Sequence, residues 1–221
     1  MKKAYVLSGL GADERVFINL KFNPLNLYFV KWIEPMQNET ISSYAKRLCL
    51  QLEETSPILI GLSFGGIMAV EISKIIDTEQ IILLSSAKTK YEIPFIYRLA
   101  GKLHLNRYVP ISMLKTANIF SYWLFNIKSK EEKELFKQIL KDTDPVFLKW
   151  AIDKIVNWKN TIIPQQLIHI HGTKDKILPM YFIKNKIRIQ GGGHLMVLNK
   201  ADEVSSAIAK CLSGQSLGDQ Y

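Results

Sequence analysis

Short apolar runs alternate with helical patterns through most of this chain, and that alternation restricts the fold more than any other feature. The runs are bounded by turn-forming residues, and apolar residues at helical spacing follow many of them. Strands separated by helices are typical of βαβ units, in which a parallel sheet has helices on both faces. The sequence predicts strands at residues 3–7, 27–33, 58–61, 81–84, 166–170 and 187–190.

The middle of the chain interrupts this alternation. Residues 88–160 contain no convincing strand and many aromatic residues, whereas strands resume near residue 166. We therefore expect a core formed by residues 1–87 and 161–221, with residues 88–160 inserted as a helical cap. A chain of 221 residues fits one domain that carries such an insertion.

Residues 61–65 read Gly-Leu-Ser-Phe-Gly, a G-x-S-x-G pattern that is weak evidence by itself. Its surroundings strengthen it, because an apolar strand leads into the motif and an apolar helix follows it. In such a turn the serine backbone is strained, and Gly61 and Gly65 leave room for close packing. Ser63 is therefore a candidate nucleophile at the amino end of a helix, whose dipole favours negative charge. A serine that only caps this helix is the alternative.

A serine hydroxyl needs a general base to act as a nucleophile near neutral pH. His194 is the preferred base, because it follows three glycines in the loop after the last predicted strand. Asp175 follows the penultimate predicted strand and is the candidate acid that would orient His194. The chain order Ser63, Asp175, His194 is the nucleophile–acid–base order expected on a sheet of this kind.

The other three histidines are weaker candidates for the base. His104 lies in the middle segment, where a position in the core or on the surface is the simpler interpretation. His169 and His171 alternate within or just beyond a predicted strand. We expect one of these two to face the core and the other to face the loop.

An acyl-transfer site also needs N–H donors for a developing oxyanion. Phe64, directly after the serine, offers one backbone N–H, and the glycine-containing loop at residues 8–11 offers another, which we assign to Leu10. The same loop could suggest nucleotide binding, but it lacks both G-x-G-x-x-G and G-x-x-x-x-G-K-[ST]. No His, Cys, Asp and Glu cluster has metal-ligand spacing, so we expect no metal and no cofactor.

In four motifs this chain resembles the α/β-hydrolase superfamily, and from residue 3 to residue 212 it looks like a compact, serine-type bacterial member. The motifs are Ser8-Gly9-Leu10-Gly11, Gly61-Leu62-Ser63-Phe64-Gly65-Gly66, His171-Gly172-Thr173-Lys174-Asp175 and Gly192-Gly193-His194. The resemblance implies an α/β-hydrolase fold, with a mostly parallel sheet of about six strands, helices on both faces and an inserted helical cap. Family members often carry His-Gly before the oxyanion loop, where this chain has Ser8-Gly9.

The resemblance also implies roles for particular residues. Ser63, His194 and Asp175 would form the catalytic triad, and Gly61 and Gly65 would shape the nucleophile elbow. Leu10 and Phe64 would donate to the oxyanion. The chain begins at what would be the third strand of the family, which shortens the sheet.

Positive charge is concentrated in the middle of the chain. The chain has 29 Lys+Arg and 20 Asp+Glu, which give a net charge of +9. Between residues 88 and 159 lie 14 of the Lys+Arg and 7 of the Asp+Glu. A solvated helical surface is the simplest interpretation, and a platform for an acidic partner is the alternative. No recognised motif organises the segment for nucleic acid. No apolar run reaches the roughly 18–20 residues that a membrane span needs, and we expect a cytoplasmic protein whose Cys49 and Cys211 are free, buried thiols.

Together these features predict a serine hydrolase that cleaves a small-molecule carboxylic ester through an acyl-enzyme on Ser63. Most aromatic residues of the cap should form its own core and its contact with the sheet, and a minority should line an apolar acyl pocket. A thioesterase acting on an acyl chain presented by an acidic acyl-carrier protein is one alternative, and an acyltransferase is another. A non-catalytic receptor or scaffold with the same fold is the alternative outside enzymes.

Overall fold

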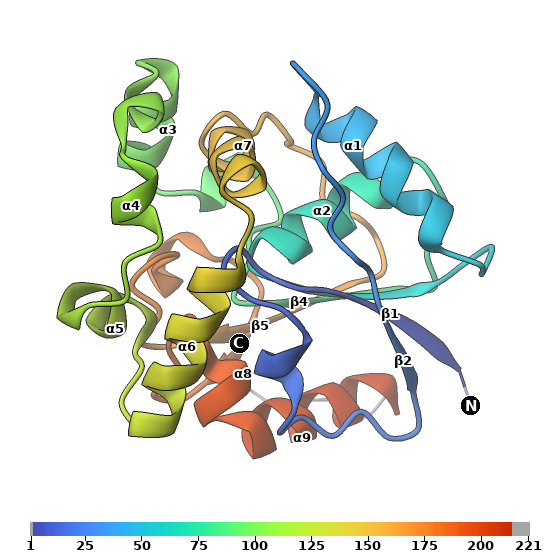
Figure 1. Cartoon of the computed structure of the whole chain (residues 1–221). Helices are drawn as coiled ribbons and strands as arrows, with labels where there is room; N and C mark the ends of the chain where they lie inside the picture. Colours follow the sequence, from blue (N-terminus) through green and yellow to red (C-terminus); the bar gives the residue numbers. More distant parts are fainter. Residues whose placement is uncertain (1, 214–221) are drawn as a thin grey trace.

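A six-stranded parallel sheet forms the centre of the molecule (Figure 1). The computed structural model describes residues 2–213. Its strands are β1 (Lys3–Leu7), β2 (Asn26–Phe29), β3 (Ile58–Leu62), β4 (Gln80–Leu84), β5 (Leu167–Gly172) and β6 (Ile187–Ile189). They pair in the order β2-β1-β3-β4-β5-β6, and every pair is parallel. The predicted sheet is therefore confirmed, and its strand order reverses between β1 and β3, where such sheets bind ligands.

Helices cover both faces of this sheet. On one face lie α1 (Ile41–Leu48) and α2 (Phe64–Ile72), and on the other lie α8 (Met196–Asn199) and α9 (Ala201–Leu212) (Figure 1). Every residue of α2 is buried, in agreement with its nearly all-apolar sequence. The sequence predicts its start near Ile67, but the helix begins at Phe64, directly after the serine of the G-x-S-x-G motif.

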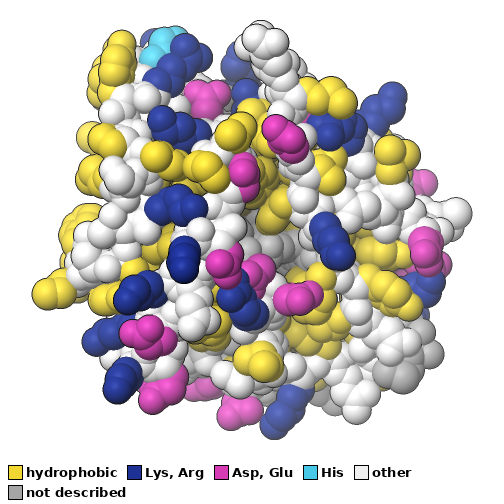
Figure 2. Space-filling model, in the orientation of Figure 1, with side chains coloured by type: hydrophobic (Ala, Val, Ile, Leu, Met, Phe, Trp, Pro, Cys, Tyr) yellow, Lys and Arg dark blue, Asp and Glu magenta, His cyan; other side chains and the backbone are white. Residues whose placement is uncertain are grey.

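Between β4 and β5 the described chain forms helices and no strand. The α-helices are α3 (Phe95–Lys102), α4 (Ile111–Leu114), α5 (Ile119–Phe125), α6 (Lys130–Asp142) and α7 (Pro145–Val156). As the sequence predicts, Ser129 and Glu132 form a capping box at the start of α6, and the Asp144 side chain caps α7. These inserted helices lie beyond the carboxyl ends of the strands (Figure 1), and hydrophobic side chains gather along the outer edge of α3–α5 (Figure 2). A separate cap domain at residues 88–160 stays a prediction.

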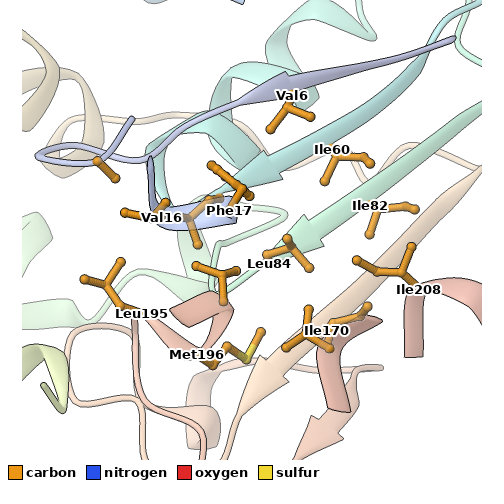
Figure 3. Close-up of a cluster of buried hydrophobic side chains, with 14 of the residues drawn as sticks. Val6, Val16, Phe17, Ile60, Ile82, Leu84, Ile170, Leu195, Met196 and Ile208 are labelled. Carbon is orange, nitrogen blue, oxygen red and sulfur yellow. The ribbon is translucent and has the colours of Figure 1, made fainter. Parts of the chain in front are cut away.

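Apolar side chains fill the space on both sides of the sheet. Successive residues of a strand point to opposite faces, so each strand contributes to two clusters. One cluster packs beneath α8 and α9 and includes Val6, Ile60, Ile82, Leu84, Ile170, Met196 and Ile208 (Figure 3). The other packs beneath α1 and α2 and includes Tyr5, Leu59, Ile81 and Leu83. Burial on both faces explains why the strands read as continuous apolar runs in the sequence.

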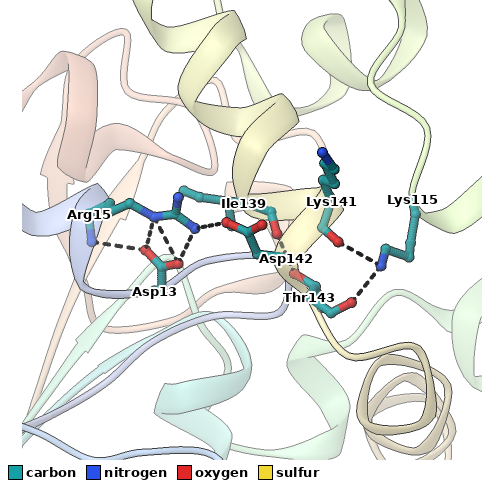
Figure 4. A network of polar contacts seen from close by, with 7 residues as sticks. All are labelled: Asp13, Arg15, Lys115, Ile139, Lys141, Asp142 and Thr143. Atoms are coloured by element: carbon teal, nitrogen blue, oxygen red, sulfur yellow. Dashed lines mark hydrogen bonds and ion pairs between the residues drawn. The ribbon is translucent and has the colours of Figure 1, made fainter.

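A polar network attaches the inserted helix α6 to the loop after β1 (Figure 4). Arg15 Nη2 lies 2.8 Å from Asp142 Oδ2 at the end of α6. Lys115 Nζ donates to the carbonyl oxygens of Lys141 and Thr143 at 3.0 and 2.7 Å. The last carbonyl groups of α6 thereby gain partners, which helix ends need when water is excluded.

Three smaller expectations concern single features of the chain. Within residues 2–213, no helix is both long enough and apolar enough to cross a bilayer. Cys49 and Cys211 are free thiols as predicted, but both are half-buried because they lie at the ends of α1 and α9. The polar tail after Ser213, which the sequence predicts to fray, lies outside the described residues.

Candidate active site

Ser63 occupies a sharp turn between β3 and α2. Its backbone dihedrals are φ 51° and ψ −118°, a combination that residues other than glycine rarely adopt. A Cβ atom at Gly61 would lie 2.4 Å from the Cα of Gly66, and one at Gly65 would lie 2.1 Å from the carbonyl oxygen of Leu7. The turn is this tight because residues 61 and 65 have no side chains, and it leaves Ser63 at the amino end of α2.

Three side chains from separate loops at the carboxyl edge of the sheet are hydrogen-bonded in series. Ser63 Oγ lies 2.8 Å from His194 Nε2, and His194 Nδ1 lies 2.8 Å from Asp175 Oδ2. The second carboxylate oxygen of Asp175 accepts from the backbone N–H groups of Ile177 and Leu178, each at 2.9 Å. An ionised carboxylate only accepts hydrogen bonds, so the proton of neutral His194 lies on Nδ1 and Nε2 can accept the hydroxyl proton.

The environment of Asp175 favours its ionised form. Burial by itself would raise the pKa of this carboxyl group, but the charge and hydrogen bond of His194 act in the opposite direction. His171 and the Leu178 N–H add to their effect, and the pKa of Asp175 falls below its usual 3.8. A carboxylate that is ionised at neutral pH can stabilise the imidazolium that forms when His194 takes up a proton.

Leu10 and Phe64 both line the cavity that contains Ser63. Phe64 is the first residue of α2, where N–H groups have no partner within the helix. Neither the Leu10 nor the Phe64 N–H has a backbone acceptor among the described residues. A Cβ atom at Gly9 would lie 3.2 Å from Ser63 Cβ, so the loop after β1 runs directly beside the serine. The Trp32 indole fixes this loop by donating to Ser8 Oγ at 3.0 Å.

A cavity of about 440 Å³ opens above Ser63. Among the described residues its walls hold no Asp, Glu, Lys or Arg, and the inserted helices supply most of them. Representative apolar residues of the walls are Leu114, Leu124, Phe125, Leu148 and Ile152. Burial, followed by the nearby Asp175 charge, raises the pKa of the Tyr97 phenol in the same wall, so this hydroxyl stays neutral. The cavity is therefore mostly apolar, with a few neutral polar side chains such as Thr116, Asn118 and Ser121 in its walls and the His194 imidazole at its base.

Aromatic residues of the inserted helices occupy three kinds of position. Phe147 and Trp150 pack against Phe64 at the contact with the sheet, with ring centroids 6.0 and 6.2 Å away. Phe125 lines the cavity, 5.7 Å from the His194 ring. The sequence predicts these two groups but not a third, in which side chains such as Trp123 are exposed to solvent.

A buried chain of polar side chains, which no sequence motif indicates, runs beneath the candidate site. Lys88 Nζ lies 3.0 Å from Glu92 Oε1 and 3.3 Å from His169 Nδ1. His169 Nε2 lies 3.2 Å from His171 Nδ1. The far end of this chain is His171 Nε2, which lies 2.8 Å from the carbonyl oxygen of Leu178 and 3.4 Å from Asp175 Oδ2.

The expectation that one of His169 and His171 faces the loop is wrong. Both are buried, with 2% and 0% of their surfaces exposed, because residues two apart in a strand point to the same face. Burial is the first cause that lowers the pKa of each imidazole, and that of His169 falls well below 6.5. The available signal was the spacing itself, since two histidines at i and i+2 in a central strand share one buried face. His104, by contrast, is exposed in the inserted segment.

Comparisons with known proteins find similar structures but no similar sequence. No protein-family model and no curated protein matches the chain. An esterase from Thermogutta terrifontis matches with a TM-score of 0.66 at 15% identity, covering 97% of this chain and 90% of that one. An esterase from Exiguobacterium antarcticum matches with a TM-score of 0.68 at 16% identity, covering 96% of this chain and 92% of that one. MenH from S. aureus matches with a TM-score of 0.70 at 15% identity, covering 96% of this chain and 94% of that one. At these identities the likeness shows a shared architecture.

Within residues 2–213, no group of three or more His, Cys, Asp and Glu side chains is placed to hold a metal ion. The structure brings Ser63, Asp175 and His194 together, with Leu10 and Phe64 beside them.

Proposed function

We propose that this chain, which has the α/β-hydrolase fold, hydrolyses a carboxylic ester through an acyl-enzyme on Ser63. The observation that supports this most directly is the series from Ser63 through His194 to Asp175, in which both links are 2.8 Å long. A general base must lie within hydrogen-bond reach of the proton that it removes, and His194 Nε2 fulfils that requirement. The esterases among the similar structures agree with the proposal.

In the first half of the reaction, Ser63 Oγ attacks the ester carbonyl carbon while its proton passes to His194 Nε2. Asp175 stabilises the imidazolium, and the N–H groups of Leu10 and Phe64 donate to the tetrahedral oxyanion. Each such donor contributes roughly 3–4 kcal/mol in a comparable site. His194 then protonates the oxygen of the leaving alcohol, the carbon–oxygen bond breaks, and the acyl group remains on Ser63.

In the second half, water takes the place of the alcohol. His194 Nε2 accepts a proton from the water while the water oxygen attacks the acyl carbonyl carbon. The same two N–H groups hold the second oxyanion. His194 returns the proton to Ser63 Oγ as the bond to the serine breaks, and the free acid leaves.

The cavity indicates the kind of acyl group. Its walls are apolar and carry no charged side chain among the described residues. A carboxylate or ammonium group buried there would find no Asp, Glu, Lys or Arg to pair with, and burial of an unpaired charge is strongly unfavourable. We therefore expect neutral, hydrocarbon-rich acyl groups, whose transfer from water contributes about 0.8 kcal/mol per methylene.

The test is the turnover of p-nitrophenyl esters of increasing acyl length by the native chain and by Ser63→Ala. We expect turnover that rises with chain length until the cavity is full, and a loss of at least about 10⁴-fold in Ser63→Ala. Ser43→Ala, at an exposed position on α1, is the matched control. A folded native chain that turns over none of these esters, or a Ser63→Ala variant that retains native turnover, would contradict the proposal.

A further inference from the structure

An exposed apolar surface covers the outer side of α3, α4 and α5 (Figure 2). Of the 19 large hydrophobic residues that are exposed in the described chain, nine lie between residues 93 and 130. The six that define what we call the α3–α5 surface are Ile96, Leu103, Met113, Ile119, Phe120 and Trp123. Single exposed apolar residues are ordinary, but a concentration of this kind marks a site of interaction.

The same segment carries positive charge and contains no acidic residue of its own. Residues 93–130 contain six Lys or Arg and no Asp or Glu. None of the six forms an ion pair within the part of the chain that the structure describes. Lys102, at the end of α3, and Arg107 are exposed. The α3–α5 surface is therefore apolar and cationic together.

This surface borders the cavity above Ser63. Met113 and Phe120 are 67% and 64% exposed, and both also line the cavity. Trp123 is attached to the loop that carries Asp175, because Lys176 Nζ donates to the Trp123 carbonyl oxygen at 2.7 Å. The same ammonium lies 4.1 Å from the centroid of the Trp123 ring. The surface is therefore next to the cavity and fixed to the candidate site.

We propose that the α3–α5 surface binds an anionic lipid surface, with the cavity facing the lipid. Apolar and aromatic side chains can enter the boundary between headgroups and acyl chains while Lys and Arg contact the anionic headgroups. A purely acidic protein face would pair with the cations but would leave the large apolar side chains without a matching environment. Lipid binding does not depend on the proposed ester hydrolysis, whereas the delivery of lipid-borne esters to Ser63 rests on it.

Co-sedimentation with phosphatidylcholine vesicles, with and without phosphatidylglycerol, tests this proposal. We expect the native chain to bind the anionic vesicles, more weakly as salt is added. Ile119→Glu, at a position that is 86% exposed, should weaken binding by about tenfold or more. Ile18→Glu, at a position outside the inserted helices that is 79% exposed, should leave it unchanged. Replacing Lys102 and Arg107 by Gln should weaken binding by about fivefold for each charge removed.

Several results would overturn the proposal. The first is a native chain that binds neither kind of vesicle, and the second is an equal loss in Ile18→Glu and Ile119→Glu. Loss on removal of the charges but not in Ile119→Glu would show ionic adsorption to the headgroups without burial of apolar side chains, and would overturn the proposed contact of the α3–α5 surface with the lipid. Turnover of a water-soluble ester, measured in parallel, reports the proposed function separately: turnover without vesicle binding removes only the lipid proposal, and vesicle binding without turnover removes only the proposed hydrolysis.

The buried chain beneath Asp175 carries a second, independent inference. The Lys88 ammonium has only donors, so His169 Nδ1 accepts from it and His169 Nε2–H donates to His171 Nδ1. His171 must then carry its own proton on Nε2 and donate it to the Leu178 carbonyl oxygen at 2.8 Å. Each hydrogen-bond direction follows from the ammonium at the start of the chain.

We infer that His171 is a positioning residue for the acid of the proposed triad, an inference that rests on the proposed function. The loop from Asp175 to Leu178 supplies two N–H donors to the Asp175 carboxylate, and His171 holds the carbonyl end of that loop. A loop released at Leu178 would shift the carboxylate against His194. Misplacement of a catalytic group by about 1 Å costs roughly 100-fold in rate.

Three variants at this position provide the test, with kcat on a p-nitrophenyl ester as the readout. His171→Leu removes the donor, His171→Asn has an amide too short to reach Leu178, and His171→Gln places an amide N–H near the former Nε2. We expect kcat to fall by about 10- to 100-fold in the Leu and Asn variants, with most of the loss restored in the Gln variant. A kcat that is native in His171→Asn, or as low in the Gln variant as in the Asn variant, would overturn the inference. A native chain without turnover would remove it together with the proposed function.

Discussion

The carboxyl edge of the sheet and the inserted helices differ in whether their charged groups are buried and paired. At the sheet edge the charged groups are buried and paired, since Asp175 accepts three hydrogen bonds and Lys88 lies 3.0 Å from Glu92. Residues 93–130 contain no Asp or Glu, and their exposed cations include Lys102 and Arg107, which lie among exposed apolar residues of the same segment. Buried, paired charges fix a geometry, whereas unpaired charges beside apolar side chains can bind a surface. The proposed ester hydrolysis accordingly takes place at the sheet edge, and the proposed binding of an anionic lipid surface takes place on the inserted helices.

The largest effect is expected for Asp175→Asn, which changes the chemistry of the sheet edge and leaves the inserted helices intact. An amide at this position favours the wrong tautomer of His194 and cannot stabilise its charged form, so kcat should fall by about 10⁴-fold. Ester kinetics measure this loss, and Asp202→Asn on α9, whose side chain is 86% exposed, is the control. A loss in Asp175→Asn smaller than roughly tenfold would separate the acid from the reaction.

A comparison of two glycines tests whether the sheet edge is packed more rigidly than the helices. Gly65→Ala would place a Cβ atom 2.1 Å from the Leu7 carbonyl oxygen. Gly101→Ala would place one at the longer distances of 2.6 Å from Val156 Cγ2 and 2.8 Å from the Val156 carbonyl oxygen. We expect Gly65→Ala to lower the free energy of unfolding by more than about 3 kcal/mol and Gly101→Ala by about 1–3 kcal/mol. Denaturant unfolding of both variants measures the difference. Equal losses would show that the two regions tolerate crowding equally.

The buried histidines give the sheet edge a pH-dependent stability. Burial lowers the pKa of both His169 and His171 below 6.5, so both stay neutral in the fold while the unfolded chain binds protons near that pH. Because the unfolded state then holds more protons, the free energy of unfolding should decrease as the pH falls below about 6.5. Each histidine contributes up to about 1.4 kcal/mol per pH unit. Denaturant unfolding at several pH values should show a shallower slope for His171→Gln than for the native chain, and identical slopes would contradict this account.

The smallest effect is expected for a change of cavity size in the inserted helices. Ile152→Trp on α7 fills part of the cavity, and Val146→Trp on the same helix is the control because its side chain is 55% exposed and lies outside the lining. The preferred acyl chain should become shorter in Ile152→Trp. Each methylene that no longer fits the cavity should lower kcat/KM by about fourfold. A chain-length series measures the shift. The same shift in Val146→Trp would show that the cavity does not select the acyl group.

Local sequence signals were enough to predict the fold and to predict that the candidate site residues lie at one edge of the sheet. The alternation of strands and helices is local, and the turn at Ser63 needs glycines at fixed offsets, so both are visible without tertiary information. The carboxyl ends of parallel strands share one edge, which is why loops carrying Asp175 and His194 were expected beside the serine. The structure places them so, and their roles stay a proposal.

Other features depend on contacts that a sequence pattern does not reveal. Lys88 follows β4 and meets His169 only because β4 and β5 pair in the sheet. The exposed face of α5 was missed for a different reason, since a helix of seven residues is too short for its apolar spacing to separate an inner from an outer side. Phe120 and Trp123 were therefore counted with the aromatic residues expected mostly in the core or at the contact with the sheet, although both are exposed.

The central claim is that Ser63 is an activated nucleophile, and covalent labelling with a fluorophosphonate tests it most directly. Intact-mass measurement of the native chain should show one adduct per molecule, because His194 removes the hydroxyl proton as Ser63 Oγ attacks phosphorus. The Ser63→Ala variant should remain unlabelled. A folded native chain that gains no adduct, or an adduct that persists in Ser63→Ala, would contradict the account.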